Sequence, residues 1–171
     1  MNSLRAWNFF EILESVYSYC NVGGFGIDGG VSSLIGASFA DYEKLYFCFL
    51  GDLAFFYDLN SLGNRHVGNN VRIMVINNGK GTEFRNYSHP AAVMGEDADD
   101  FVAAAGHYGK KSRCLLRHYA EDLGFQYLTA DNKNEFLENI NVFMEPRLTE
   151  RPILMEVFTD SEDESRALNL V

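Results

Sequence analysis

Short runs rich in β-branched and aromatic residues alternate along this chain with runs whose apolar positions recur every three to four residues. The short runs predict strands at residues 16–20, 45–50, 71–76, 125–128 and 153–158. The periodic runs predict helices at about residues 3–15, 31–40, 54–62, 99–105, 112–123 and 133–144. Such alternation predicts a three-layer α/β domain, in which a mainly parallel sheet is covered by helices on both faces.

Composition and charge narrow the possible classes of protein. A chain of 171 residues with 47% hydrophobic residues predicts one domain with a continuous core. The net charge of −10 opposes binding to phosphate backbones, so we expect no nucleic-acid partner. No apolar run is long enough to span a bilayer and the first residues show no signal pattern, so we expect no membrane partner. Three cysteines without a CxxC pair suit a reducing compartment and predict a cytoplasmic protein.

A glycine-rich turn lies between the first expected strand and the following helix. Its Gly24-x-Gly26-x-x-Gly29 pattern matches the dinucleotide fingerprint, and Asp52 follows the next strand. These features predict a site for NAD or NADP. The alternative is a tight turn that needs glycine only for positive φ angles.

A second pattern joins the ends of two apolar strands. Gly51-Asp52 follows one strand and Asn77-Asn78 follows the next, and the carboxyl ends of parallel strands meet at one edge of a sheet. Mg²⁺ prefers about six oxygen ligands and shares them between protein carboxylates and substrate phosphates. The pattern therefore predicts a Mg²⁺ site formed by Asp52, Asn78 and the main-chain carbonyl of Lys80, beside the N-terminus of the next helix. The alternative is that Asp52 is a buried residue that caps a helix, and that Asn77-Asn78-Gly79 forms an ordinary turn.

These residues resemble a known family. Gly51-Asp52 followed by Asn77-Asn78 looks like the signature of the C-terminal diphosphate-binding (PP) domain of thiamine diphosphate-dependent enzymes. Gly26-Ile27-Asp28-Gly29, Asn2-Ser3-Leu4 and the segment 52–60 look more similar still to the SEPHCHC synthases of menaquinone biosynthesis. The resemblance covers nearly the whole chain and implies that residues 1–171 adopt the thiamine diphosphate-binding fold.

The resemblance implies a cofactor site for thiamine diphosphate and Mg²⁺. The metal ligands would be Asp52, Asn78 and Lys80. The residues that contact the cofactor would be Ser3, Gly26, Ile27, Gly51, Asp52, Leu53, Ala54, Asn78, Lys80 and Gly81. Ile27 would act as an apolar wedge that holds the cofactor bent, since a β-branched side chain is stiff. An Ile that fills the core under the glycine-rich turn is the alternative.

Four positions bear on the substrate that the resemblance implies. Trp7 and Val22 stand where the family has arginines that bind carboxylates. Glu83 replaces an apolar residue after the metal loop, whereas Phe84 is kept, and both are candidate substrate contacts. We therefore expect a 2-oxo acid or an acceptor different from that of the family.

Enzymes of this family complete their site with a separate pyrimidine-binding domain, and we expect no such domain within residues 1–171. The resemblance implies that the domain lies in the same longer chain or in a partner subunit. We then expect the complete enzyme to be a 2-oxo acid decarboxylase or carboligase, and the isolated chain to be inactive. We also expect a homodimer or larger oligomer. A noncatalytic module that only binds the cofactor is a further alternative.

Overall fold

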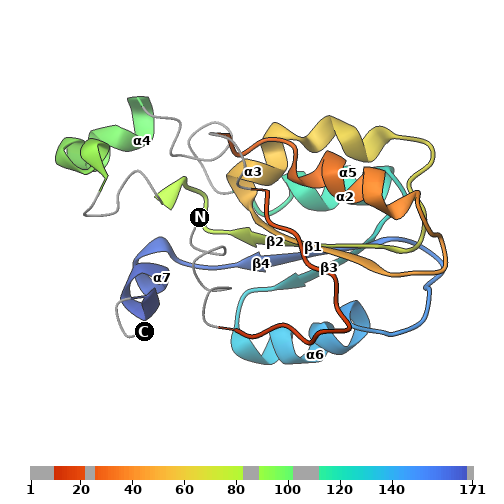
Figure 1. The fold of residues 1–171 in the computed structure, drawn as a ribbon. Helices are drawn as coiled ribbons and strands as arrows, with labels where there is room; N and C mark the ends of the chain where they lie inside the picture. Colours follow the sequence, from red (N-terminus) through yellow and green to blue (C-terminus); the bar gives the residue numbers. More distant parts are fainter. Residues whose placement is uncertain (1–9, 22–25, 83–88, 102–111, 169–171) are drawn as a thin grey trace.

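A sheet of four parallel strands forms the centre of the structure, a computed structural model that describes residues 10–21, 26–82, 89–101 and 112–168. The strands are β1 (Tyr46–Gly51), β2 (Val71–Asn77), β3 (Gln126–Ala130) and β4 (Ile153–Phe158). Their order is β1-β2-β4-β3, and every neighbouring pair is parallel (Figure 1). All four carboxyl ends therefore point to one edge, and the predicted α/β architecture with a parallel sheet is confirmed.

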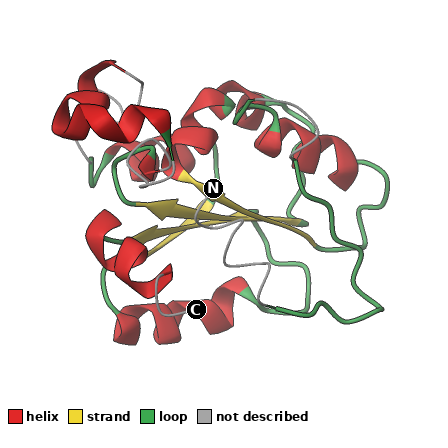
Figure 2. Cartoon of the chain, turned by 60° about the vertical axis from the view of Figure 1, so that its left-hand side comes forward, coloured by secondary structure: helices red, strands yellow, loops and turns green. Residues whose placement is uncertain are grey.

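Helices cover both faces of this sheet (Figures 1 and 2). One face carries α2 (Gly30–Ser38), α3 (Asp52–Tyr57), the 3₁₀ helix η1 (Leu59–Gly63) and α5 (Leu115–Asp122). The other face carries α6 (Lys133–Phe143). The 3₁₀ helix η3 (Pro90–Asp97), the short α4 (Ala98–Phe101) and α7 (Ser161–Leu168) lie near the carboxyl ends of the strands. In Figure 1, α4 is above the level of the sheet and α7 is below it.

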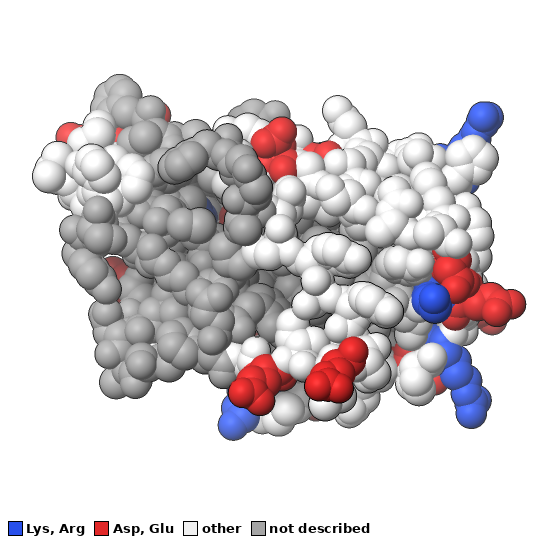
Figure 3. Space-filling model, viewed as in Figure 1, with Lys and Arg blue, Asp and Glu red and all other residues white. Residues whose placement is uncertain are grey.

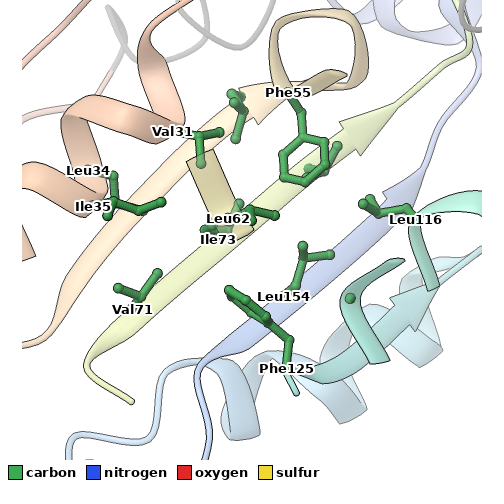
Figure 4. Close-up of a cluster of buried hydrophobic side chains, with 13 residues drawn as sticks. Val31, Leu34, Ile35, Phe55, Leu62, Val71, Ile73, Leu116, Phe125 and Leu154 are labelled. Atoms are coloured by element: carbon green, nitrogen blue, oxygen red, sulfur yellow. The ribbon is translucent and has the colours of Figure 1, made fainter. Parts of the chain in front are cut away.

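The core consists of two apolar clusters, one on each face of the sheet. Side chains alternate between faces along a strand, so Ile73 and Val75 of β2 join the cluster under α2 and α5, while Met74 joins the one under α6. Figure 4 shows the first cluster, in which side chains from α2 and α5 meet the strands. Strands buried on both faces have nearly continuous apolar sequences, as the central strands β2 and β4 do, whereas the edge strands β1 and β3 are only partly buried and carry aromatic residues that favour strands.

The first two elements expected from the pattern are wrong where the structure describes them. Residues 10–20 form neither helix nor strand, and residues 3–9 of the expected helix lie outside the described part. Tyr17 and Tyr19 are 90% and 95% exposed. Alternating aromatic residues favour a strand only when one face is buried against a neighbour, and this segment has no such buried face.

Helix boundaries also differ from the expectation. The helix expected at residues 54–62 is two pieces, because α3 ends at Tyr57 and η1 begins at Leu59. Asp58 separates them with a non-helical backbone (φ −117°, ψ 17°), and its side chain accepts a hydrogen bond from α2. Residues 102–105 of another expected helix lie outside the described part, and α7 is a helix that the pattern did not predict.

The described surface combines a charged periphery with exposed apolar side chains. On the face seen in Figure 3, acidic and basic side chains lie mainly around the edge of the described area, and uncharged side chains occupy the middle. Phe10 and Leu13 are among the large hydrophobic residues that remain exposed. None of the described helices combines the length and apolar character needed to cross a bilayer.

Candidate functional site

Polar segments meet beyond the carboxyl ends of β1, β2 and β4. Asp52 follows β1 as the first residue of α3, and its Oδ2 accepts a hydrogen bond from the main-chain N–H of Gly79 at 3.1 Å. Thr159 follows β4, and its N–H donates to the carbonyl of Asn77 at 3.0 Å. The parallel topology thus brings Asp52 to the loop that carries Asn78, as the spacing of the two motifs predicts.

The Asp52 carboxyl group is buried, with 2% of the residue exposed. Burial raises its pKa to about 6, although hydrogen bonds from the N–H groups of Leu53, Gly79 and Asp52 itself oppose the shift, while the charge of Glu164 adds to it. A buried carboxylate whose ionised form is disfavoured gains from a nearby cation. The Asp52 side chain is therefore suited to act as a ligand of a cation.

The side-chain amide of Asn78 is held at both of its ends. Its Nδ2 donates to Thr82 Oγ1 and to Glu164 Oε2, each at 2.8 Å. Its Oδ1 accepts from the N–H of Lys80 at 2.9 Å and retains a second lone pair. The amide is therefore fixed in one orientation, with an oxygen that can take a further partner.

The side chain of Lys80, in the loop after β2, pairs with a residue of α4. Lys80 Nζ forms an ion pair with Asp99 Oδ2 of α4 at 3.3 Å. Gly79 has a φ of 79°, a backbone conformation that favours glycine. The positive φ lets the chain reverse direction so that the N–H of Gly79 points at Asp52. The predicted contribution of Lys80 is its main-chain carbonyl oxygen, and the ion pair engages only its side chain.

The chemistry of this donor set fits Mg²⁺. One carboxylate, one amide oxygen and one carbonyl oxygen are hard ligands, and they leave positions for phosphate oxygens and water. Within the described ranges no group of three or more His, Cys, Asp or Glu side chains could hold a metal ion. A transition-metal centre built from such side chains is therefore not found there. These residues instead support a site in which the cation is bound by oxygens of the protein together with oxygens of a phosphate and of water.

The glycine-rich turn is described from Gly26 onward. Gly29 has a φ of 85° and precedes α2 directly, so the need for positive φ is confirmed at this position. Ile27 is 41% exposed. The alternative in which Ile27 fills the core is therefore wrong, and its proposed contact with a cofactor stays a prediction.

The start of α2 is already occupied by a side chain of this protein. Asp58 Oδ2 accepts a hydrogen bond from the N–H of Ser32, in the first turn of α2, at 2.6 Å. A dinucleotide diphosphate would need these N–H groups, and the Asp58 carboxylate would repel it. This contact speaks against the dinucleotide interpretation of the Gly24-x-Gly26-x-x-Gly29 pattern.

The remaining predicted site residues divide into two groups. Gly51 ends β1, Leu53 and Ala54 lie in the first turn of α3, and Gly81 follows Lys80 in the loop after β2. These four therefore lie in the same segments as Asp52 and Asn78. Ser3, Glu83 and Phe84, together with Trp7 and Val22, lie outside the described residues.

Glu164 is a residue at this site that the sequence analysis missed. It lies in α7, and a local signal for that helix exists, because Asp160 Oδ1 accepts from the N–H groups of Glu162 and Asp163. An aspartate cap followed by an acidic first turn is typical of a helix start. That signal could have located α7, but the contact of Glu164 with Asn78 joins residues 86 positions apart and depends on the fold.

A buried polar cluster lies next to the site. Glu156 of β4 is fully buried and accepts hydrogen bonds from Asn77 Nδ2 at 2.5 Å and from the Tyr127 hydroxyl at 2.6 Å. Burial raises the pKa of Glu156 above its usual value. Because Asn77 directly precedes Asn78, this cluster fixes the end of β2 from which the predicted cation ligand projects.

The fold and the site define a parallel α/β domain whose strand ends carry a buried carboxylate and an oriented amide. The chain is 35% identical to the 2-succinyl-5-enolpyruvyl-6-hydroxy-3-cyclohexene-1-carboxylate (SEPHCHC) synthase of Bacteroides fragilis over 167 residues, which are 98% of this chain. It is 33% identical over 165 residues to the enzyme of the same name from Bacteroides thetaiotaomicron, and 34% identical over 167 residues to that of Phocaeicola vulgatus. The resemblance to SEPHCHC synthases is confirmed.

The aligned part is a limited share of each relative. The chain spans 28% of the length of all three proteins, and this share corresponds to a C-terminal part of them. No family model matches the chain.

The raised pKa of Asp52 predicts how stability depends on pH. Because the folded-state pKa of about 6 exceeds the ordinary aspartate pKa of 3.8, the contribution of this group to stability is fully present below pH 3.8 and is lost as the pH rises through 6. Asp52→Asn removes the titration. Without added cation, we expect this variant to gain stability relative to wild type between pH 4 and 6.5, measured by urea unfolding. A difference independent of pH would contradict the assignment.

Proposed function

We propose that this chain binds the diphosphate of thiamine diphosphate through Mg²⁺, as the diphosphate-binding domain or subunit of a 2-oxo acid decarboxylase or carboligase. The observation that carries the proposal is the junction of Asp52 with the Asn78 loop through the 3.1 Å hydrogen bond to Gly79. It supports the Mg²⁺ interpretation because both oxygen donors lie at the carboxyl edge of the sheet. Similarity to SEPHCHC synthases over 98% of the chain supports the cofactor.

In this proposal Asp52, Asn78 and the Lys80 carbonyl hold the cation, and the cation holds the diphosphate. The Asp52 carboxylate offsets part of the charge of Mg²⁺, which in turn offsets the charge of the diphosphate on an acidic protein. When bound, thiamine diphosphate supplies an electron sink for the decarboxylation of a 2-oxo acid. Ile27, which is exposed within the glycine-rich turn, is available to contact the ring system.

A pyrimidine-binding domain completes the site in this proposal. The chain matches 28% of its relatives' length, so most of such an enzyme has no counterpart in it. Phe10, Leu13, Tyr17 and Tyr19 expose large apolar side chains along one segment of the chain, and removing such side chains from water would stabilise a contact with a partner there. Self-association into a dimer or larger oligomer and an altered substrate are part of the same proposal.

Calorimetric titration of the full chain with thiamine diphosphate and with NAD, each with and without Mg²⁺, tests this function. We expect binding of thiamine diphosphate only when Mg²⁺ is present, and no binding of NAD. Binding of NAD without dependence on Mg²⁺ would favour the dinucleotide function instead. Binding without turnover by the chain recombined with a pyrimidine-binding domain would favour a noncatalytic module.

Ile27→Ala should separate binding from activity. Because Ile27 is 41% exposed, the stability loss should be less than the roughly 2–5 kcal/mol of a buried isoleucine, and the affinity for the diphosphate should be retained. Activity of the chain recombined with a pyrimidine-binding domain should fall by about 100-fold, since misplaced reacting groups have effects of this size. Ile27→Met, which keeps apolar bulk, is the control. Wild-type turnover in the alanine variant would contradict the wedge role.

A further inference from the structure

The carboxylate of Glu164 joins the last helix to the proposed cation site. Its Oε2 accepts a hydrogen bond from Asn78 Nδ2 at 2.8 Å. Its other oxygen, Oε1, accepts one from the hydroxyl of Thr159, directly after β4. Glu164 therefore connects the loop after β2 with the segment that follows β4, two of the three polar segments that meet at this edge of the sheet.

The partners of Asn78 determine which way its amide faces. Turning an amide over exchanges its oxygen and its NH₂ group with little change in shape. The Glu164 carboxylate can only accept, so it requires the NH₂ group on the α7 side, whereas the Lys80 N–H can only donate and requires the oxygen on the loop side. The Thr82 hydroxyl could pair with either end, so it does not select an orientation.

We propose that Glu164 is a positioning residue for the cation site, which keeps the Asn78 oxygen on the Lys80 side and polarises the amide. This inference rests on the proposed function, because it assigns to Asn78 the role of cation ligand. Partners of metal ligands orient those ligands and increase their basicity, and a hydrogen bond to a carboxylate is stronger than one between neutral groups. Glu164 enters this proposal only as the partner of Asn78 and Thr159, and the cation ligands remain Asp52, Asn78 and the Lys80 carbonyl.

Glu164→Gln in the full chain tests this role, with Glu162→Gln as the matched control. Both variants remove one negative charge from α7, and Glu162 is exposed. At a fixed concentration of thiamine diphosphate, Glu164→Gln should weaken Mg²⁺ binding by about tenfold, and Glu162→Gln should leave it unchanged. The NH₂ resonances of Asn78, assigned by their loss in Asn78→Asp, should shift in the ¹⁵N spectrum of Glu164→Gln and not in that of Glu162→Gln. Thr82→Val should keep the Mg²⁺ affinity within about threefold, because it leaves both selecting partners in place.

A purely structural role for Glu164 gives a different result. Thr159→Val removes the hydrogen bond from the Thr159 hydroxyl to Glu164 Oε1, so a structural role predicts that both substitutions lower the melting temperature and the Mg²⁺ affinity together. Positioning predicts that Thr159→Val lowers only the melting temperature. Glu164→Asp, which withdraws the carboxylate by one methylene group, should reproduce the loss of affinity if the glutamine variant does not fold.

The outcomes separate this inference from the function on which it rests. Equal Mg²⁺ affinity in wild type, Glu164→Gln and Glu164→Asp would overturn the positioning role while the proposed function stands. If the wild-type chain binds no Mg²⁺ and no thiamine diphosphate, the proposed function fails, and the positioning role fails with it.

Discussion

Replacing Asp52 with alanine should lower the Mg²⁺-dependent affinity of this chain for thiamine diphosphate by at least about 100-fold, more than the effect of changing an outer partner of a metal ligand. Asp52 supplies the only full negative charge among the three proposed cation ligands. Without it, the cation and the diphosphate would be held by neutral oxygens on a protein whose net charge is −10. Calorimetric titration with thiamine diphosphate at several Mg²⁺ concentrations measures the loss.

Two variants serve as controls for Asp52→Ala. Asp52→Asn keeps an acceptor for the Gly79 N–H but loses the charge, so it should fold and still bind weakly. Asp41→Ala makes the same change in net charge before β1, at the opposite edge of the sheet, and should bind normally. Cofactor affinity unchanged in both Asp52 variants would end the assignment of the metal site.

Replacing Glu156 with alanine should lower the free energy of unfolding by about 2–4 kcal/mol, because a buried polar group left without a partner costs about 1–3 kcal/mol. The Asn77 amide and the Tyr127 hydroxyl both lose their acceptor. Glu156→Gln should be milder, since its oxygen can accept from Asn77 while its NH₂ group donates to the Tyr127 oxygen. Urea unfolding of the three proteins measures the difference.

The effect of Glu156→Ala should also depend on pH. Burial raises the pKa of Glu156 above the ordinary glutamate value of 4.5, so the stability that this group contributes is fully present below pH 4.5 and declines as the pH rises through its folded-state pKa. The alanine variant should therefore lose more stability, relative to wild type, at pH 4.5 than at pH 7. A loss that grows with pH would show that the buried carboxylate is stabilised as an anion.

The sequence by itself determined the parallel sheet and the pairing of its strand ends. Strands β1 to β4 were predicted within two residues at each end. The central strands β2 and β4 are buried on both faces and have nearly continuous apolar sequences, and the half-buried edge strands β1 and β3 carry aromatic residues that favour strands. The meeting of Asp52 with the Asn78 loop followed from the same pattern, since parallel strands carry their carboxyl ends to one edge. The prediction for residues 10–20 was wrong, because alternating aromatic residues form a strand only where a neighbouring element buries one of their faces.

Only the tertiary structure decided how the side chains of the site are held. The contacts of Glu164 with Asn78, of Asp58 with Ser32 and of Glu156 with Asn77 join residues 86, 26 and 79 positions apart. Local pattern cannot specify such pairs, because their geometry depends on strand order and on where each helix begins. The sequence placed a carboxylate and an amide at one edge of the sheet, and the fold buried the first, raising its pKa, and fixed the orientation of the second.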